Sequence, residues 1–428
     1  MPSAVAAVLD EEQRPGESWI LNDPYRGGTH LPDITVITPL FHERELAGFA
    51  ASRAHHADVG AEEPGSMPAF SRTLDEEGVV IPPTRLTDEL LRELAERMRN
   101  PRQREADLRA QLAAGRAGGE RVAALVERFG LDTFRAGLRE TLDYAERRTR
   151  ARVDELEDGT YEAADVLEGA DEDLALRVTA RVDGDRVELD FTGSAPQHDG
   201  NLNCPLAVTL SACYFALRVL TDPDVPPCAG AYRPLTVVAP EGSLLNARSP
   251  AAVAGGNVET SSRVADLVLA AFGHALGQGT MNNLTLGNAD FTYYETLGGG
   301  QGACPDADGP SGVHVAMSNT LNTPIEALEL EFPLRAVEYS LRRGSGGAGR
   351  HRGGDGVVRE LEALAEMRFS LITERRRHAP PGADGGEPGA PGRNLLNGEE
   401  LPPKASGNLS RGDRLRIETP GGGGYGRE

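Results

Sequence analysis

Lysine is almost absent from this 428-residue sequence: Lys404 is the one lysine, and arginine supplies the remaining positive charge. A Schiff-base lysine or the lysine of a Walker-type phosphate loop would have to be Lys404, which follows two prolines near the end of the chain. We discount both functions. Acidic residues outnumber basic ones by 66 to 44, which leaves a formal charge of -22. Nucleic acids and anionic membranes repel such a chain, so we expect neither as a partner.

Cysteine is also scarce, and no long apolar run occurs. The four cysteines show no C-x-x-C spacing and are too few for a disulfide framework, so we expect reduced thiols in a cytoplasmic protein. No apolar run reaches the ~18 residues of a membrane span. Residues 1–10 lack the basic start of a signal peptide and have the pattern of a short helix. We therefore expect the chain to begin within a structured region.

The patterning predicts a mixed α+β fold, with Gly-rich β-sheet layers and an inserted helical segment near residues 87–156. In that segment Thr87 is a predicted helix cap, Pro101 and the glycines at 115–119 are predicted interruptions, and Gly130 is a predicted helix end before a helix capped by Asp132. The expected units are 1–86, a sheet region with the candidate metal site; 87–160, helical; 161–343, an α/β core; and 344–428, a Gly-rich β region.

Period-two alternation predicts a hairpin between residues 174 and 191. Two alternating strands flank Asp183-Gly184-Asp185, and Asp-Gly supplies the positive φ of a tight turn. Further on, a segment over residues 314–323 alternates in the same way and ends in an Asn/Thr cluster. We expect strands at both places.

The stretch from Asn22 to Asp58 holds four of the nine histidines. His30 and Asp33 form an H-x-x-D pair after a Gly-Gly turn, and an H-H-x-D group begins at His55. The segments 34–38 and 46–51 read as two buried strands between these groups. Neighbouring strands would bring both polar groups to the same end of a sheet.

Two imidazoles and one carboxylate suit a divalent Mn, Fe or Zn ion, so we propose His30, Asp33 and His55 as ligands. His56 and Asp58 would then support the ligands or face the substrate, because adjacent side chains on an extended segment point to opposite faces. H-x-x-D is a short pattern, however, and polar residues that stabilise a turn would produce it as well. Spacing alone leaves both interpretations open.

A second polar stretch, Ala254 to Ser262, places Asn257, Glu259 and Thr260 just before a predicted helix at 264–276. Such groups often cap a helix, and this is the simpler interpretation. Alternatively, they form a loop that binds a substrate carboxylate or another anion, because free N–H groups and the helix dipole converge there.

Glycine dominates the remainder of the chain. Residues 343–356, RGSGGAGRHRGGDG, could surround a phosphate with backbone N–H groups and arginines. They lack the G-x-x-x-x-G-K-[ST] pattern and a surrounding strand-to-helix unit, so wide β-turns are the better explanation.

Together these motifs resemble the hydantoinase B/oxoprolinase family, which includes the B half of 5-oxoprolinase, N-methylhydantoinase and related subunits of acetone-type carboxylases. The matching motifs are NDPYRGGTHLPD (22–33), ASRAHHADVG (51–60), PGSMP (64–68), AGGNVETS (254–261), GTMNN (279–283), YYET (293–296), NTPIE (322–326), GSGGAGRHRGGDG (344–356) and TPGGGGYG (419–426). They run the length of the chain. The family usually has a further N-terminal stretch with additional histidine-containing sequence, so we expect that this chain is shortened at its start.

The resemblance implies metal ligation by His30, Asp33 and His55, and division of labour with a hydantoinase A-type subunit in a hetero-oligomer. That subunit would bind ATP and phosphorylate the carbonyl oxygen of a small cyclic amide, such as 5-oxoproline of glutathione metabolism or a hydantoin. A metal-bound water would then open the ring here, with His56 or Asp58 as general base.

The remaining expected site residues contact substrate. We assign Glu259 a catalytic role and, with Asn257, the holding of the substrate amide or carboxylate. Thr260, Asn319 and Asn322 are further expected substrate-binding residues.

Two other functions fit the same resemblance. The chain could be a subunit of an acetone- or acetophenone-type ATP-dependent carboxylase, in which the metal binds an enolate and the partner phosphorylates bicarbonate. It could also be a non-catalytic scaffold that stabilises the A-type subunit.

Overall fold

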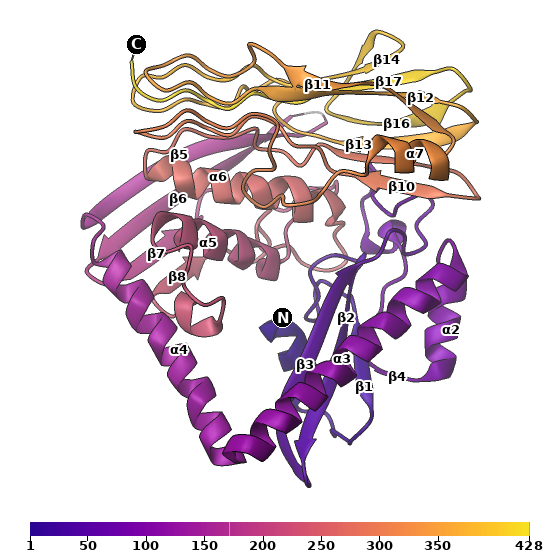
Figure 1. Ribbon diagram of the computed structural model, residues 1–428. Coiled ribbons are helices and arrows are strands. Elements are labelled where there is room, and N and C mark those ends of the chain that lie inside the picture. Colours follow the sequence, from indigo (N-terminus) through magenta and orange to yellow (C-terminus); the bar gives the residue numbers. More distant parts are fainter. Residues whose placement is uncertain (171, 428) are drawn as a thin grey trace.

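The computed structural model describes residues 1–170 and 172–427, and its mixed helices and sheets confirm the α+β prediction. Figure 1 shows four regions: an N-terminal sheet at the lower right, two C-terminal sheets stacked at the top, a further sheet with two helices at the left, and a long helical arm below. Within the described residues no helix has both the length and the apolar character required to cross a membrane.

The N-terminal sheet contains four antiparallel strands in the spatial order β3-β2-β1-β4. The two strands predicted from β-branched and apolar residues form a hairpin at one edge of this sheet, in which Asp33 pairs with His55. The second of them, β3, was predicted to be buried but is half-buried. The elements of this region are α1 (Pro2–Leu9), β1 (Ser18–Leu21), β2 (Asp33–His42), β3 (Glu45–His55), the 3-10 helix η1 (Leu74–Glu77) and β4 (Thr84–Leu86).

The helical arm comprises α2 (Asp88–Glu96), α3 (Pro101–Phe129) and α4 (Leu131–Val153). Thr87 caps α2 by accepting a hydrogen bond from the Leu90 N–H, as predicted. The predicted break at Gly115–Gly119 is wrong, because α3 runs through it. At Gly115 a Cβ would lie 2.7 Å from the Thr38 hydroxyl, so glycine lets the helix approach β2 closely. Gly130 separates α3 from α4 as predicted. It is also the N-cap of α4, so the prediction that Asp132 caps this helix is wrong, and Asp132 lies within the first turn.

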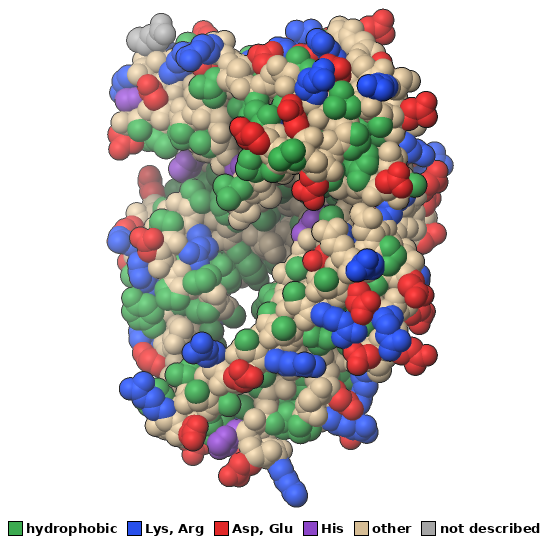
Figure 2. Space-filling model, turned by 45° about the vertical axis from the view of Figure 1, so that its right-hand side comes forward, with side chains coloured by type: hydrophobic (Ala, Val, Ile, Leu, Met, Phe, Trp, Pro, Cys, Tyr) green, Lys and Arg blue, Asp and Glu red, His purple; other side chains and the backbone are tan. Residues whose placement is uncertain are grey.

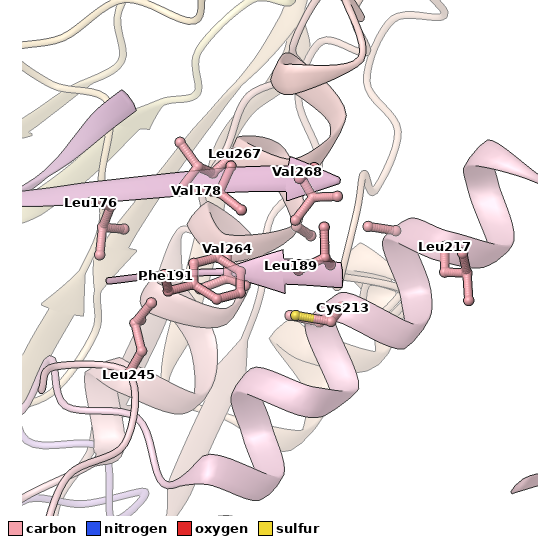
Figure 3. Close-up of a cluster of buried hydrophobic side chains, with 14 of the residues drawn as sticks. Leu176, Val178, Leu189, Phe191, Cys213, Leu217, Leu245, Val264, Leu267 and Val268 are labelled. Atoms are coloured by element: carbon pink, nitrogen blue, oxygen red, sulfur yellow. The ribbon is translucent and has the colours of Figure 1, made fainter. Parts of the chain in front are cut away.

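The sheet at the left of Figure 1 has the order β5-β6-β7-β8, and α5 and α6 cover it. Figure 3 shows side chains of β6, β7, α5 and α6 packed into one buried cluster. The predicted hairpin is confirmed, and Gly184 in its turn has φ 54°. The elements are β5 (Gly159–Glu168), β6 (Asp173–Asp183), β7 (Arg186–Asp190), α5 (Leu206–Leu220), the 3-10 helix η2 (Ala229–Tyr232), β8 (Leu235–Val238), the π-helix η3 (Gly256–Thr260) and α6 (Ser261–Ala271).

The two stacked sheets have the orders β10-β9-β13-β16 and β11-β12-β17-β14-β15. Leu286 and Phe369 from one sheet pack with Leu361 and Ile417 from the other in a second buried cluster. The elements are β9 (Asn283–Gly287), β10 (Thr292–Glu295), α7 (Ile325–Glu331), β11 (Leu334–Arg342), β12 (Gly356–Ala363), β13 (Met367–Ile372), β14 (Arg393–Leu396), β15 (Glu399–Leu401), β16 (Lys404–Leu409) and β17 (Arg414–Glu418).

The glycine-rich C-terminal segments form layers of loop rather than a phosphate cradle. The Gly422 N–H donates to the Gly354 carbonyl (2.9 Å), and the Gly347 N–H donates to the Gly422 carbonyl (2.9 Å). Backbone groups of these segments therefore bond one another, which agrees with the turn interpretation. The predicted strand over 314–323 is wrong: its residues form turns and irregular chain between β10 and α7.

Candidate metal centre and its surroundings

The β2–β3 hairpin positions two of the three expected ligands. Asp33 is the first residue of β2 and His55 the last of β3, and the antiparallel register places them opposite each other. His30 precedes β2 in a turn in which the Asp33 N–H donates to the His30 carbonyl at 3.0 Å. The turn is fixed by Asn22, whose side-chain N–H groups donate to the carbonyls of Leu31 and Val79 at 2.8 Å. Sequence reasoning had assigned Asn22 no individual role.

The structure brings His30, Asp33 and His55 together. One ligand atom from each lies within 4.8 Å of the others, and His55 Nδ1 is 3.0 Å from Asp33 Oδ1. Two ligands of one ion can be at most about 4.2 Å apart, twice a metal–ligand distance of ~2.1 Å. The group is therefore close to the geometry that a shared ion requires.

Among the three residues, His30 has the clearest features of a metal ligand. Its side chain is 1% exposed, and neither ring nitrogen has a hydrogen-bond partner within the described part of the chain. Burial lowers the pKa of His30 to about 4, so the ring is neutral and its lone pair is available at neutral pH. A buried polar group without a partner costs free energy, and a bound cation would remove that cost.

The charge of Asp33 is maintained by its neighbours. Burial by itself would raise the pKa of this carboxyl group, but the hydrogen bond with His55 and the nearby His55, His30 and Arg53 together hold it below its ordinary value. Asp33 is therefore ionised, as a metal ligand must be.

Tyr294 on β10 connects this group to the second polar stretch. Its ring stacks on the His55 ring at a centroid distance of 5.3 Å, and its hydroxyl donates to Asn283 Oδ1 at 2.8 Å. Asn283 Nδ2 in turn donates to Glu259 Oε1 at 2.9 Å. Glu259 thus reaches His55 through two intermediate side chains. Sequence reasoning missed Tyr294 and Asn283 as individual residues, although both lie in the motifs YYET and GTMNN.

Glu259 is completely buried, and its Oε2 has no hydrogen-bond partner among residues 1–170 and 172–427. Burial, reinforced by the negative charge of Glu374, raises the pKa of Glu259 to about 8. The carboxyl group is therefore mainly protonated at neutral pH.

His56 and His55 contact different elements, as expected for neighbours on an extended segment. His56 is buried, and its Nε2 lies 2.9 Å from Gln111 Oε1 on α3. Its Nδ1 lacks a partner among the residues that the structure describes. Burial lowers the pKa of His56, so this ring is also neutral at neutral pH.

Asp58 lies outside the three-residue group. Its carboxylate accepts hydrogen bonds from the backbone N–H groups of Gly60 (2.7 Å) and Gly65 (2.8 Å) and an ion-paired bond from Arg99 (2.8 Å). These contacts fix the loop that follows β3. Asp58 is, beside His56, one of the two predicted general bases, and these contacts show that it also has a structural role.

The stretch expected to form a loop before a helix is itself helical. Gly256–Thr260 form a π-helical turn that continues into α6, because the small residues allow close packing: a Cβ at Gly256 would lie 1.8 Å from the Asn203 carbonyl oxygen. Thr260 Oγ1 donates to the Leu202 carbonyl at 2.6 Å, and Asn257 is half-buried. The predicted helix start at 264 was thus too late.

The two expected substrate-binding asparagines lie between β10 and β11. Asn319 is exposed. Asn322 donates to Glu295 Oε1 (3.0 Å) and the Thr296 carbonyl (2.9 Å) and accepts from the Tyr339 hydroxyl (3.0 Å). Asn322 therefore links local chain segments, and the structure does not bring either asparagine into the His30 group.

Lys404 is buried in an ion pair with Glu374, and its ammonium group also donates to the Glu168 carbonyl at 2.7 Å. These contacts hold the ammonium group of Lys404 in the interior of the protein.

A cavity of about 820 Å³ adjoins the candidate centre, with His55 and Tyr294 in its wall. The other walls come from the start of α3 and from β10. This volume is in the range of small-molecule sites.

Comparison with known proteins gives the family. A sequence profile described as hydantoinase B/oxoprolinase matches residues 1–428. The chain is 38% identical to a 5-oxoprolinase of Dictyostelium discoideum over 98% of this chain. It is 32% identical, over 96% of this chain, to a protein of Pseudomonas sp. (strain NS671) that is named as the B-type subunit of a D-/L-hydantoinase. It covers 35% of the first protein and 76% of the second, so it spans about a third of the length of the oxoprolinase.

Two solved structures share the fold. The ATP-dependent caprolactamase from Pseudomonas jessenii has a TM-score of 0.88 at 26% identity, over 99% of this chain and 79% of that one. An acetone carboxylase in its nucleotide-free form has a TM-score of 0.83 at 20% identity, over 99% of this chain and 67% of the other. At this identity the likeness shows a shared fold alone. From the profile match over the whole sequence and these identities, the chain belongs to the hydantoinase B/oxoprolinase family.

Proposed function

We propose that this chain is the B-type subunit of an ATP-dependent cyclic amide hydrolase, which opens 5-oxoproline or a hydantoin together with an ATP-binding A-type subunit. The observation that carries the proposal is the convergence of His30, Asp33 and His55 beside a cavity, with both nitrogens of the buried His30 unpaired within the described residues. This proposal also includes metal binding, assembly into a hetero-oligomer, a cytoplasmic location and a role in glutathione metabolism.

The donor set fits a divalent Mn, Fe or Zn ion, since it combines two neutral imidazoles with one carboxylate. Such an ion, when bound, polarises a carbonyl oxygen or lowers the pKa of a water molecule. The role of the chain is to hold its own ligands in place. The pairing of β2 with β3 fixes Asp33 opposite His55, Asn22 fixes the turn of His30, and Tyr294 restricts rotation of the His55 ring.

His56 is the better candidate for a general base. It follows His55 directly, and its Nδ1 has no partner within residues 1–170 and 172–427. Asp58, by contrast, already accepts from two backbone N–H groups and Arg99. A base must be free to accept a proton, so the accepting atom would be Nδ1 of the neutral His56 ring.

The relatives support both the reaction class and the need for a partner. One relative is named as the B-type part of a hydantoinase, the caprolactamase is named as ATP-dependent, and this chain covers only about a third of the Dictyostelium 5-oxoprolinase. The remaining length of that protein has room for an A-type region. The glycine-rich segments here bond to themselves, so we assign ATP binding to the partner.

Co-purification with an A-type subunit, followed by assays of phosphate release and product formation, tests the proposal. The substrates to compare are 5-oxoproline, hydantoins, and ketones with bicarbonate. We expect stimulated phosphate release and ring opening with a cyclic amide only. Stimulation only by ketones with bicarbonate would instead identify a carboxylase, and ring opening by this chain alone without nucleotide would contradict the division of labour.

The scaffold alternative makes a different prediction about the metal. If the chain only stabilised its partner, a His30→Ala variant would leave both metal content and the activity of the complex unchanged. A His42→Ala variant is the matched control, because His42 lies at the opposite end of β2 from Asp33.

A further inference from the structure

The cavity beside the candidate metal centre has a positively charged wall. Figure 2 shows that the molecule is hollowed between the helical arm and the remaining body. The cavity of about 820 Å³ is lined by His55, by the start of α3 from Asn100 to Arg104, and by β10 and the residues before it. Two arginines, Arg102 and Arg104, contribute to the α3 wall. A ligand in this cavity would thus touch both α3 and the edge of the metal centre.

Arg104 is unusual for an arginine in a cavity wall. It is 2% exposed, and an ion pair joins its Nη2 to Asp107 Oδ2 at 2.9 Å. Its Nε is buried and has no acceptor within the described portion of the chain. A buried donor without an acceptor is unfavourable, and more so when the group is charged. This atom is enclosed by protein, so an anionic ligand in the cavity would be attracted by the charge of the guanidinium and not by this donor.

The N-terminus of α3 adds to the same charge. The helix is 29 residues long, begins at Pro101, and has as N-cap Asn100, whose side chain makes no capping hydrogen bond. The positive end of the helix dipole therefore remains directed at the cavity wall that contains Arg102 and Arg104. Helix end and buried arginine are independent features, and both favour negative charge.

Carboxylates also face this cavity. Asp290 and Glu331 line it, but both are exposed, so water and salt screen them. Asp107 neutralises part of the Arg104 charge, but it is itself 46% exposed. The buried charge in the wall is therefore that of Arg104.

We propose that Arg104, together with the first turn of α3, is a subsite for an oxyanion of the substrate. The oxyanion is either the carboxylate of a substrate such as 5-oxoproline or the phosphoryl group of an activated intermediate. A guanidinium binds both with paired hydrogen bonds, so it would fix the orientation of the substrate relative to His55. This inference deepens the proposed function and rests on it, because it assigns the cavity to the reacting substrate.

Calorimetric titration of the full-length, metal-depleted chain tests the subsite without any contribution from a bound ion. The ligands are inorganic phosphate and 5-oxoproline, in separate experiments. The variants are Arg104→Gln, which removes the charge, and Arg104→Lys, which keeps the charge but loses the paired geometry. Arg109→Gln is the matched control, since Arg109 lies on the same helix with 47% of its side chain exposed.

We expect Arg104→Gln to weaken binding by about tenfold or more, Arg104→Lys to be intermediate, and Arg109→Gln to bind as the wild type. If Arg104→Gln weakens the binding of phosphate alone, the subsite binds a phosphoryl group. If it weakens the binding of 5-oxoproline alone, the subsite binds a carboxylate. Binding that is unchanged in Arg104→Gln, or equally weakened in Arg109→Gln, would overturn the proposal.

Two further measurements distinguish a failure of the subsite proposal from a failure of the proposed function. Circular dichroism and metal content of Arg104→Lys show whether the fold and the His30 group are intact, since this conservative variant keeps a positive charge beside Asp107. If the wild-type complex opens a cyclic amide with ATP while Arg104→Gln keeps full activity and an unchanged KM, the subsite is wrong and the function stands.

Discussion

The two polar stretches that stand out in the sequence differ in how their polar atoms are used. In the first stretch both ring nitrogens of the buried His30 lack partners within the described residues. In the second, the hydroxyls of Thr260, Ser261 and Ser262 all donate to backbone carbonyls of their own or neighbouring segments. Polar atoms that the fold has already paired stabilise it, whereas unpaired buried atoms indicate a ligand. By this criterion His30 makes the first stretch a candidate for chemistry. In the second stretch the three hydroxyls support the fold, and Glu259, whose buried Oε2 lacks a partner within the described residues, is the candidate for chemistry.

The largest expected effect comes from removing a ligand. An Asp33→Asn variant keeps the size of the side chain but loses its negative charge, and we expect metal affinity to fall by more than about 100-fold, the upper range for changes to groups that only support ligands. Titration calorimetry with Mn²⁺ and Zn²⁺ measures it, with His42→Ala as control. Affinity within a few-fold of the wild type would remove Asp33 from the centre.

Substitutions of the hydroxyl residues in the second stretch should change the stability of the fold and leave metal binding unchanged. Thr260→Val leaves the buried Leu202 carbonyl without its donor, so we expect a loss of about 1–3 kcal/mol in the free energy of unfolding, with metal affinity unchanged. Chemical denaturation measures the loss. A stable variant whose complex shows a raised KM would show instead that Thr260 binds substrate, as its motif predicted.

Tyr294 joins the two stretches, and two variants distinguish its ring from its hydroxyl. Tyr294→Leu removes the ring that packs on His55, and we expect about tenfold weaker metal binding. Tyr294→Phe keeps the ring and loses only the bond to Asn283, so its effect should be smaller. Equal losses of metal affinity in both variants would assign the role to the hydroxyl. If neither variant loses metal affinity, Tyr294 does not couple the two stretches.

The last effect concerns pH. The pKa of Glu259 is about 8 in the folded chain, against an ordinary value of 4.5. Between these values the folded state retains a proton that the unfolded state releases, so this group lowers stability as pH rises. Between pH 5 and pH 8 the melting temperature of the wild type should therefore fall more than that of Glu259→Gln. The variant thus gains stability relative to the wild type as the pH rises. Parallel changes in the two proteins would contradict the raised pKa.

Much of the first stretch could be predicted because its information is local. The β-branched and apolar run after Asp33 and the second run before His55 indicate neighbouring strands, and strand pairing then places the two residues opposite each other. The hairpin turn at Gly184 was equally local. Where patterns over a few residues determine structure, the sequence was sufficient.

Other features depend on contacts that no short pattern contains. The three glycines within residues 115–119 looked like helix breakers, but the approach of α3 to Thr38 makes glycine favourable at Gly115. Tyr294 lies more than 200 residues from His55 in sequence, and only the approach of β10 to the end of β3 in the N-terminal sheet brings their rings together. The three donors to the Asp58 carboxylate come from Gly60, Gly65 and Arg99, and no short pattern around Asp58 contains them all.

The central claim is that His30, Asp33 and His55 share one divalent ion. Anomalous X-ray diffraction from crystals of the chain grown with Mn²⁺ tests it most directly. The account predicts a single anomalous peak about 2.0–2.2 Å from a nitrogen of each histidine and an oxygen of Asp33. A peak bound by other residues, or no peak at these three side chains in crystals that contain the metal elsewhere, would contradict it.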